Sequence, residues 1–174
     1  SKRGIKNVVY GAQIIDPRET PRKQYSWTFK LTQSDHSTEL CVGLDSSNNK
    51  YINSGFEGVG LWESPHFLFT NDGRLLPHPI CEYKQWKSGD IIELKLIPRR
   101  RYNTLSYLYL YVNGEKSGRV SPPPADGRYE NINWRLAIVL SHKEQQIELI
   151  SFEKKIAEFK SKPVVPSGFK CVLN

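Results

Sequence analysis

The chain has 174 residues, enough for one domain with a sizeable core but cramped for two. Its formal net charge of +7 permits an acidic or nucleic-acid partner but specifies neither. No apolar run has the length of a membrane span. The chain has three cysteines, a small and odd number, whereas a disulfide framework uses an even number. We therefore expect an intracellular protein, cytoplasmic or nuclear, without a membrane partner. Because the chain neither begins with Met nor contains one, we expect it to be a piece of a longer protein.

The first 24 residues form a basic N-terminal extension, interrupted by Gly and Pro, with one short edge strand broken at Gly11. Residues 25–31 alternate apolar and polar side chains, and this period of two predicts a strand. Residues 40–44 form the next predicted strand, in which Gly43 marks a close approach of another backbone. Residues 45–60 form a long polar loop, and we expect Asp45 in a solvated turn there rather than at a metal site.

The central part of the chain carries the clearest strand and turn signals. Asn71-Asp72-Gly73 predicts a hairpin turn after a short strand at residues 66–70. Residues 91–97 alternate apolar and charged side chains, whereas residues 107–112 alternate apolar side chains with tyrosines and end on Asn113-Gly114, a type I′ turn signal. The face formed by Tyr107, Tyr109 and Tyr111 is either covered by a terminal segment or available for binding.

The last third of the chain predicts two more core strands, at residues 134–140 and 147–152. Residues 153–162 predict a short helix, because Ile156 and Phe159 stand three residues apart. The total is about nine short strands with turn signals between them and at most one helix. Such spacing is typical of an all-β sandwich or barrel and argues against a parallel α/β fold.

Five short motifs, in this order and spacing, resemble the SPRY domain, which is called B30.2 when an N-terminal extension is attached. They are an aromatic strand, an apolar-Gly strand, an Asp-Gly hairpin, a Gly-Asp-apolar-apolar start and an aromatic-Asn-Gly end: residues 25–29, 41–44, 71–74, 89–92 and 110–114. Leu110 stands where the family usually has Phe, and residues 96–99 replace its usual Leu-Asp. The resemblance is therefore to a divergent SPRY domain.

This resemblance implies a bent sandwich of two antiparallel sheets with concanavalin-type topology. The sandwich would span residues 25–152, with residues 1–24 as an extension packing on it and residues 153–174 as a C-terminal helix or tail. The resemblance also implies no catalytic activity, no cofactor, and binding of a peptide or protein partner through loops at one end. Such domains often serve a ubiquitin ligase, a scaffold or a chromatin complex.

The candidate binding residues lie in the predicted loops. By the resemblance, Tyr51 and Trp62 occupy the places where peptide-binding SPRY domains carry aromatic residues, although Trp62 could equally cover the edge of the core. Arginine and aromatic residues on loops of a rigid scaffold are candidate anchors. We predict a binding rim at the following positions: Tyr51, Trp62, Arg101, Tyr102 and His142.

Two other function classes stay open. Arg99, Arg100 and Arg101, followed by Tyr102, suit phosphates and stacked bases, so the alternative is nucleic-acid binding through this basic loop and the tails. A second alternative is a carbohydrate-binding sandwich, which rests on architecture alone. No signature of a hydrolase nucleophile, a zinc protease, an EF-hand or a phosphate-binding loop is present, so we predict neither catalysis nor a metal.

Overall fold

The computed structural model describes residues 7–16, 19, 21–33, 39–46, 66–76, 82–97, 107–121, 133–157 and 170–172. These residues form eleven strands and no helix, and hence no helix long and apolar enough to cross a membrane. The chain divides into two compact units, one made of residues 1–16, 31–90 and 132–147 and the other of residues 17–30, 91–131 and 148–174. A five-stranded sheet lies mainly in the first unit, and a six-stranded sheet lies mainly in the second.

The five-stranded sheet is antiparallel throughout. Its order is β1 (Asn7–Tyr10), β9 (Trp134–Leu140), β3 (Leu40–Ser46), β4 (His66–Thr70) and β5 (Leu75–Leu76). Gly43 on β3 lies opposite Leu68 on β4 and Ala137 on β9. A Cβ atom added to Gly43 would lie 1.8 Å from the carbonyl oxygen of Phe67, which confirms the predicted close approach of two backbones.

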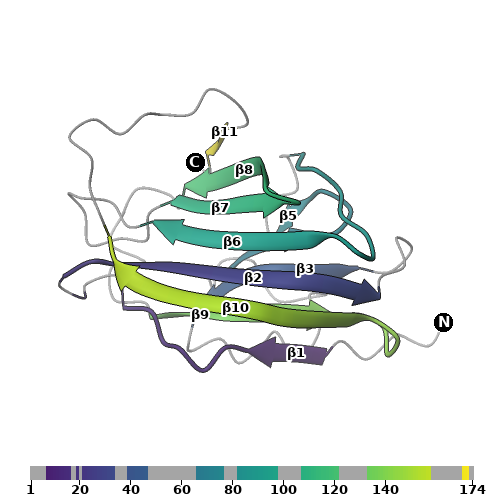
Figure 1. Cartoon of the computed structure of the whole chain (residues 1–174), viewed down its shortest axis with the longest axis horizontal. Helices are drawn as coiled ribbons and strands as arrows, with labels where there is room; N and C mark the ends of the chain where they lie inside the picture. The colour runs from purple at the N-terminus through teal and green to yellow at the C-terminus, as the bar shows by residue number, and fades with distance from the viewer. Residues whose placement is uncertain are drawn as a thin grey trace. The chain divides into compact units, whose positions relative to one another are not determined.

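The six-stranded sheet contains the longest strands (Figure 1). Its order is β10 (Gln146–Ile156), β2 (Lys23–Gln33), β6 (Ile91–Ile97), β7 (Tyr107–Val112), β8 (Glu115–Ser121) and β11 (Lys170–Val172). β11 pairs with β8 in parallel, which departs from the expected purely antiparallel sheets. Along β6 the buried residues Ile92, Leu94 and Leu96 alternate with half-buried ones, as the period of two predicts.

The Asn113-Gly114 turn joins β7 and β8 as predicted. Both residues have positive φ, 52° at Asn113 and 79° at Gly114, which a type I′ turn requires. The Asn113 side chain also accepts a hydrogen bond of 2.8 Å from the Ile91 N–H. The turn is therefore fastened to the start of β6, which explains why an Asn suits its first position.

The predicted helix at residues 153–162 is wrong where the structure describes it, because residues 153–156 continue strand β10. The Ala157 N–H donates a 2.9 Å hydrogen bond to the Arg22 carbonyl, at the start of β2. Backbone groups that a helix would pair internally are thus used between strands. Lys154 and Lys155, which fall within the predicted helix, lie on an edge strand instead.

The prediction of a solvated turn at Asp45 is also wrong. β3 extends to Ser46, and Asp45 within it is completely buried. A short run of Asp, Ser and Asn indicates a turn, but here the Tyr10 hydroxyl on β1, two strands away in the sheet, donates a hydrogen bond to the carboxylate.

Candidate functional site

Of the residues predicted for the binding rim, the structure describes only His142. The other predicted positions lie outside the described residues: Tyr51, Trp62, Arg99, Arg100, Arg101 and Tyr102. Their proximity to one another is therefore still a prediction.

His142 is exposed in the turn between β9 and β10. The buried side chain of Gln145 holds this turn, since its Oε1 accepts hydrogen bonds from the N–H groups of Ser141 (2.8 Å) and His142 (3.1 Å). The His142 Nδ1 atom accepts a further bond of 3.2 Å from the Glu144 N–H. A ring held on an exposed and internally bonded turn suits surface recognition.

The Asp-Gly hairpin between β4 and β5 is locked by charge. The Arg74 guanidinium contacts Asp72 and Glu39, each at 2.9 Å, and the Thr70 hydroxyl donates to Asp72. Burial alone would raise the pKa of Asp72, but the hydrogen bonds from Arg74 and Thr70 bring it below the ordinary value. These contacts close a turn, which gives them a structural role.

In the described part of the five-stranded sheet, the buried Asp45 and the half-buried Tyr10 and Arg135 form a polar cluster. The Tyr10 hydroxyl donates a 3.1 Å hydrogen bond to Asp45, and the Arg135 guanidinium carbon lies 3.5 Å from the centre of the Tyr10 ring. Burial, followed by the negative charge of Asp45 and the hydrogen bond to it, raises the pKa of Tyr10 to about 12. The hydroxyl stays protonated at neutral pH and ties β1 to β3.

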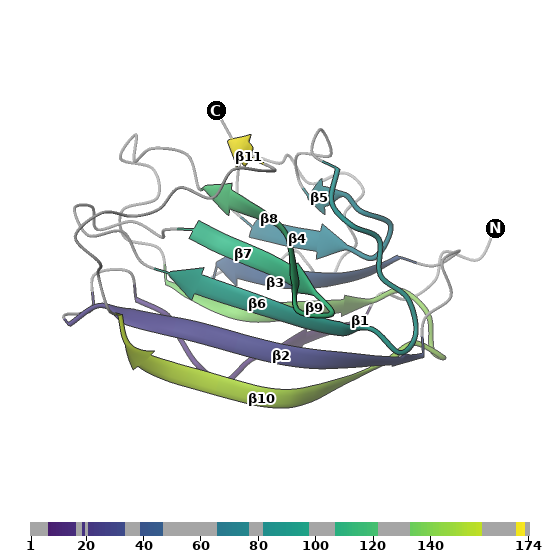
Figure 2. The same ribbon diagram turned by 45° about the horizontal axis from the view of Figure 1, so that its top comes forward.

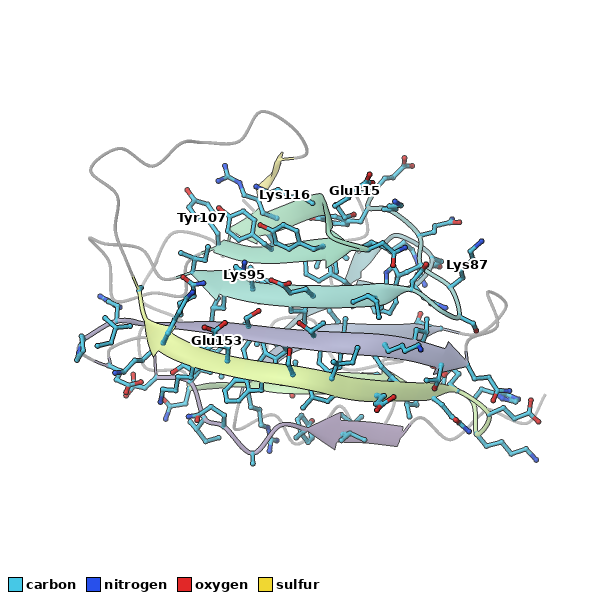
Figure 3. The ribbon with its side chains drawn as sticks, in the orientation of Figure 1. Lys87, Lys95, Tyr107, Glu115, Lys116 and Glu153 are labelled. Atoms are coloured by element: carbon cyan, nitrogen blue, oxygen red, sulfur yellow. The ribbon has the colours of Figure 1, made fainter. Side chains whose placement is uncertain are left out.

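The six-stranded sheet carries a row of tyrosines on β7. The rings of Tyr107 and Tyr109 lie 6.0 Å apart, and those of Tyr109 and Tyr111 lie 6.4 Å apart, all on one face of the strand. Figure 3 shows Tyr107 and Lys95 on the same side of the ribbon. We call this surface the tyrosine face and define it by these residues: Tyr107, Tyr109, Tyr111, Glu93, Lys95, Lys116 and Arg119.

Each ring of the tyrosine face lies under a cation. The Lys116 ammonium lies 4.2 Å from the Tyr109 ring centre, and the Arg119 guanidinium lies 4.2 Å from that of Tyr107. The Lys95 ammonium lies 5.3 Å from the Tyr111 ring centre. These distances are in the range of cation–π attraction, which fixes both partners on the sheet.

Lys116 and Arg119 lie on the same face of β8 because of a β-bulge in that strand. Lys116 and Arg119 are three residues apart, so strict alternation would put them on opposite faces. Tyr111 pairs with Lys116 whereas Leu110 pairs with Gly118, so that Ser117 is the extra residue of a bulge. The sequence revealed the tyrosines by their alternation, but only the register reveals that these two cations join them.

The tyrosine face is positively charged. Tyr107 and Tyr111 at its two ends are half-buried, whereas Tyr109 and Arg119 are buried. Lys95, Lys116 and Arg119 stand against the single carboxylate of Glu93, which contacts Lys95 at 3.2 Å. Burial, and after it the charge of Arg119, lowers the pKa of Lys116. Burial also raises the pKa of Tyr111 against the opposing effect of Lys95, so its hydroxyl remains a neutral hydrogen-bonding group at neutral pH.

Within the described residues, no group of three or more His, Cys, Asp or Glu side chains is arranged to hold a metal ion.

No model of a protein family matches the chain, and no curated protein matches it either. Solved structures do resemble it. The SPRY domain of human HERC1 matches with a TM-score of 0.59 at 15% identity, over 84% of this chain and 82% of that one. A human SPRY domain matches with a TM-score of 0.57 at 13% identity, over 86% of both chains. The carbohydrate recognition domain of Emp47p matches with a TM-score of 0.56 at 9% identity, over 90% of this chain and 80% of that one.

These likenesses identify the fold. The chain has a SPRY-like fold, and the predicted all-β class with two sheets is confirmed. Identities of 9% to 15% carry the fold alone, so the function has to be argued from the surfaces of this chain.

Proposed function

We propose that this chain is a non-catalytic protein-interaction module that binds a peptide or protein partner as part of a larger protein or complex. The observation that carries the proposal is the tyrosine face, where three rings lie under three cations on one sheet. Tyrosine and arginine are enriched at protein interfaces and at their energetic hot spots. A rigid sheet presents them at little cost in conformational entropy.

The partner that suits this face is an acidic segment of a protein. Cations outnumber carboxylates there, and the whole chain carries a charge of +7. The segment with the predicted residues Arg101 and Tyr102 joins Ile97 to Tyr107, which pair with each other at one end of the face. Tyr51, Trp62 and His142 belong to the proposal as a second contact region on the loops.

The same geometry favours a protein over a nucleic acid or a sugar. Bases and sugars bind tyrosine by stacking on an open ring face. Here each ring has a cation at 4.2 to 5.3 Å, and Tyr109 is only 9% exposed. Tyrosine hydroxyls and cations, in contrast, suit carboxylates and backbone groups of a peptide.

The proposal is tested by panning a random-peptide display library on the unsubstituted chain, called the parent below. We expect enriched acidic peptides whose affinity falls about tenfold or more in a Lys95→Glu/Lys116→Glu double variant, since two attractive charges become repulsive. Lys87→Glu is the matched control, because Lys87 is exposed in the turn before β6 and lies outside the tyrosine face. Equal binding of the peptides to the double variant and the parent would refute the assignment.

The loop region has its own test with the same peptides. Trp62→Ala and Tyr51→Ala should keep the circular dichroism spectrum and weaken binding; unchanged affinity in both shows that these loops are not the rim. If the chain binds an RNA oligonucleotide with an affinity that falls steeply with salt, the partner is a nucleic acid rather than a protein. If it binds sugars on a glycan array, the partner is a carbohydrate.

A further inference from the structure

β10 forms one edge of the six-stranded sheet (Figure 2). Among the described residues, no strand pairs with its outer side. Every residue from Glu148 to Ile156 is exposed, including the apolar Leu149 (51%), Ile150 (50%), Phe152 (42%) and Ile156 (58%). Proteins usually shield such an edge with charged side chains, Pro, bulges or short length, because its unpaired N–H and C=O groups can pair with another strand. β10 has eleven residues, no Pro and charges of both signs, so it is suited to accept a strand of complementary charge.

The contacts of β10 with β2 show which of its backbone groups point outward. Ala157 bonds to Arg22, the Phe152 ring stacks on Trp27 at 5.8 Å, and the Lys154 ammonium lies 5.6 Å from the Tyr25 ring centre. These three contacts agree on one antiparallel register, in which odd-numbered residues of β10 bond to β2. In an antiparallel pair the backbone groups alternate, so those of even-numbered residues from 148 to 156 face outward.

This requirement limits how a second copy of β10 could pair with the first. Outward-facing residues must lie opposite each other, so an antiparallel pair of identical strands has to be centred on one residue. Centred on Ser151, Glu148 lies opposite Lys154 and Ile150 lies opposite Phe152, each twice by symmetry. Centring on a neighbouring residue instead puts Glu148 opposite Phe152 or Ile156.

We propose that β10 pairs with β10 of a second copy of this chain, antiparallel and centred on Ser151, so that two six-stranded sheets become one continuous sheet. We choose a second copy as the partner because of charge complementarity: in the antiparallel pair, Glu148 of each strand lies opposite Lys154 of the other. Glu148 has no ion pair among the described residues. Lys154 has two loose contacts, with Glu19 at 3.7 Å and with the Tyr25 ring centre at 5.6 Å, and neither prevents an ion pair with the partner strand.

Charge reversal tests the register. Sedimentation velocity over a concentration series should show a dimer, and Glu148→Lys or Lys154→Glu should each raise its dissociation constant about tenfold or more, because two ion pairs become two repulsions. An equimolar mixture of the two variants should dimerise again, since each brings the charge that the other lacks. The matched controls are Glu153→Lys and Lys155→Glu on the opposite face of β10, which should dimerise like the parent.

A cross-link tests the centre independently of the charges. Two Ser151 residues would form a pair without backbone hydrogen bonds, with Cα atoms about 4.5 Å apart, which suits a disulfide. Ser151→Cys should therefore give a covalent dimer under mild oxidation beyond the level of the parent. Glu153→Cys is the control, because its two copies would lie about 13 Å apart along the strands. A chain that stays monomeric at every concentration, a mixture that does not restore the dimer, or Ser151→Cys that cross-links no more than Glu153→Cys would each overturn the proposal.

Discussion

The two sheets of this domain differ in how they use their faces. In the five-stranded sheet, β3 from Leu40 to Asp45 and the whole of β4 are buried without alternation. In the six-stranded sheet, buried and half-buried residues alternate along β6. A strand buried on both faces offers no side chain to a partner, which is why we place the proposed recognition surface on the six-stranded sheet.

Some polar residues of the two sheets differ in the same way, although Ser117 and Arg119 of the six-stranded sheet are also buried. Asp45, Thr70 and Asn71 of the five-stranded unit are at most 1% exposed and bond to neighbouring strands or turns. Lys95 and Glu93 of the six-stranded sheet keep about a third of their side-chain surface exposed. Polar groups of the first kind hold the fold, whereas those of the second kind are available for binding. The predictions below test this contrast.

The largest expected effect is that of Gly43→Ala in the five-stranded sheet. The added Cβ would meet the Phe67 carbonyl at 1.8 Å, and that backbone is fixed by the pairing of β3 with β4. Because the strands must move apart, we expect the free energy of unfolding to fall by about 3 kcal/mol, at the upper end for overpacking. Urea unfolding followed by tryptophan fluorescence measures it.

Gly114→Ala is the matched control from the six-stranded sheet. No atom lies within 4 Å of its added Cβ, and only the positive φ of 79° opposes the substitution. We expect a loss of about 1 kcal/mol, the cost of placing an L-residue in that conformation. Equal losses in the two variants would contradict the tight backbone approach at Gly43.

The next prediction compares two tyrosines, Tyr10 in the five-stranded sheet and Tyr111 in the six-stranded sheet. Tyr10→Phe removes a hydrogen bond to the buried Asp45 and should cost about 2 kcal/mol. Tyr111→Phe should change stability by less than about 0.5 kcal/mol, because the ring is half-buried at a surface. Urea unfolding of both variants at neutral pH gives the two values, and a larger loss at Tyr111 would reverse the assigned roles.

Alkaline pH supplies a second readout for Tyr10. Its pKa rises from about 10 in the unfolded chain to about 12 in the folded one, so the folded state holds the proton more tightly. The stability that this proton provides is complete below pH 10 and is lost as the pH rises through 12. The difference in unfolding free energy between the parent and Tyr10→Phe should therefore shrink over this interval, and a constant difference would contradict it.

The period of two in the sequence was sufficient to predict most of these strands. Trp27, Phe29 and Leu31 are all buried on one face of β2, as their alternation indicates. Gly43 and the Asn113-Gly114 turn were predicted from residue chemistry, because few residue types tolerate a backbone contact or a positive φ. Such features depend on local constraints that one stretch of sequence contains.

The failures of prediction concern contacts made over long distances in the chain. Asp45 is buried because Tyr10, 35 residues earlier, donates to it. Residues 153–156 extend because β2 pairs with them, although their apolar spacing also fits a helix. Two of the three cations of the tyrosine face, Lys116 and Arg119, share that face because of a bulge at Ser117, which no local pattern marks. The tyrosines and Lys95 were therefore visible in the sequence as members of one face, whereas Lys116 and Arg119 were not.

The smallest expected effect on stability is that of Lys116→Met, which removes one cation of the tyrosine face and keeps its apolar stem. The loss of the contact with the Tyr109 ring, 4.2 Å away, is offset by relief of burial and of repulsion from Arg119, so we expect a change of a few tenths of a kcal/mol. Folding lowers the pKa of Lys116, so the unsubstituted chain gains stability as the pH rises from the folded pKa toward 10.5. Lys116→Met lacks this titrating group, so urea unfolding should show the unsubstituted chain becoming more stable relative to the variant over that interval.

Affinity for the acidic peptides should fall in the same variant, although less than in Lys95→Glu/Lys116→Glu. If removal of this cation lowers the affinity for the peptides but hardly changes the free energy of unfolding, its role is in binding. If the free energy of unfolding falls as much as the free energy of binding, the tyrosine face has a structural role, like the polar groups of the five-stranded sheet.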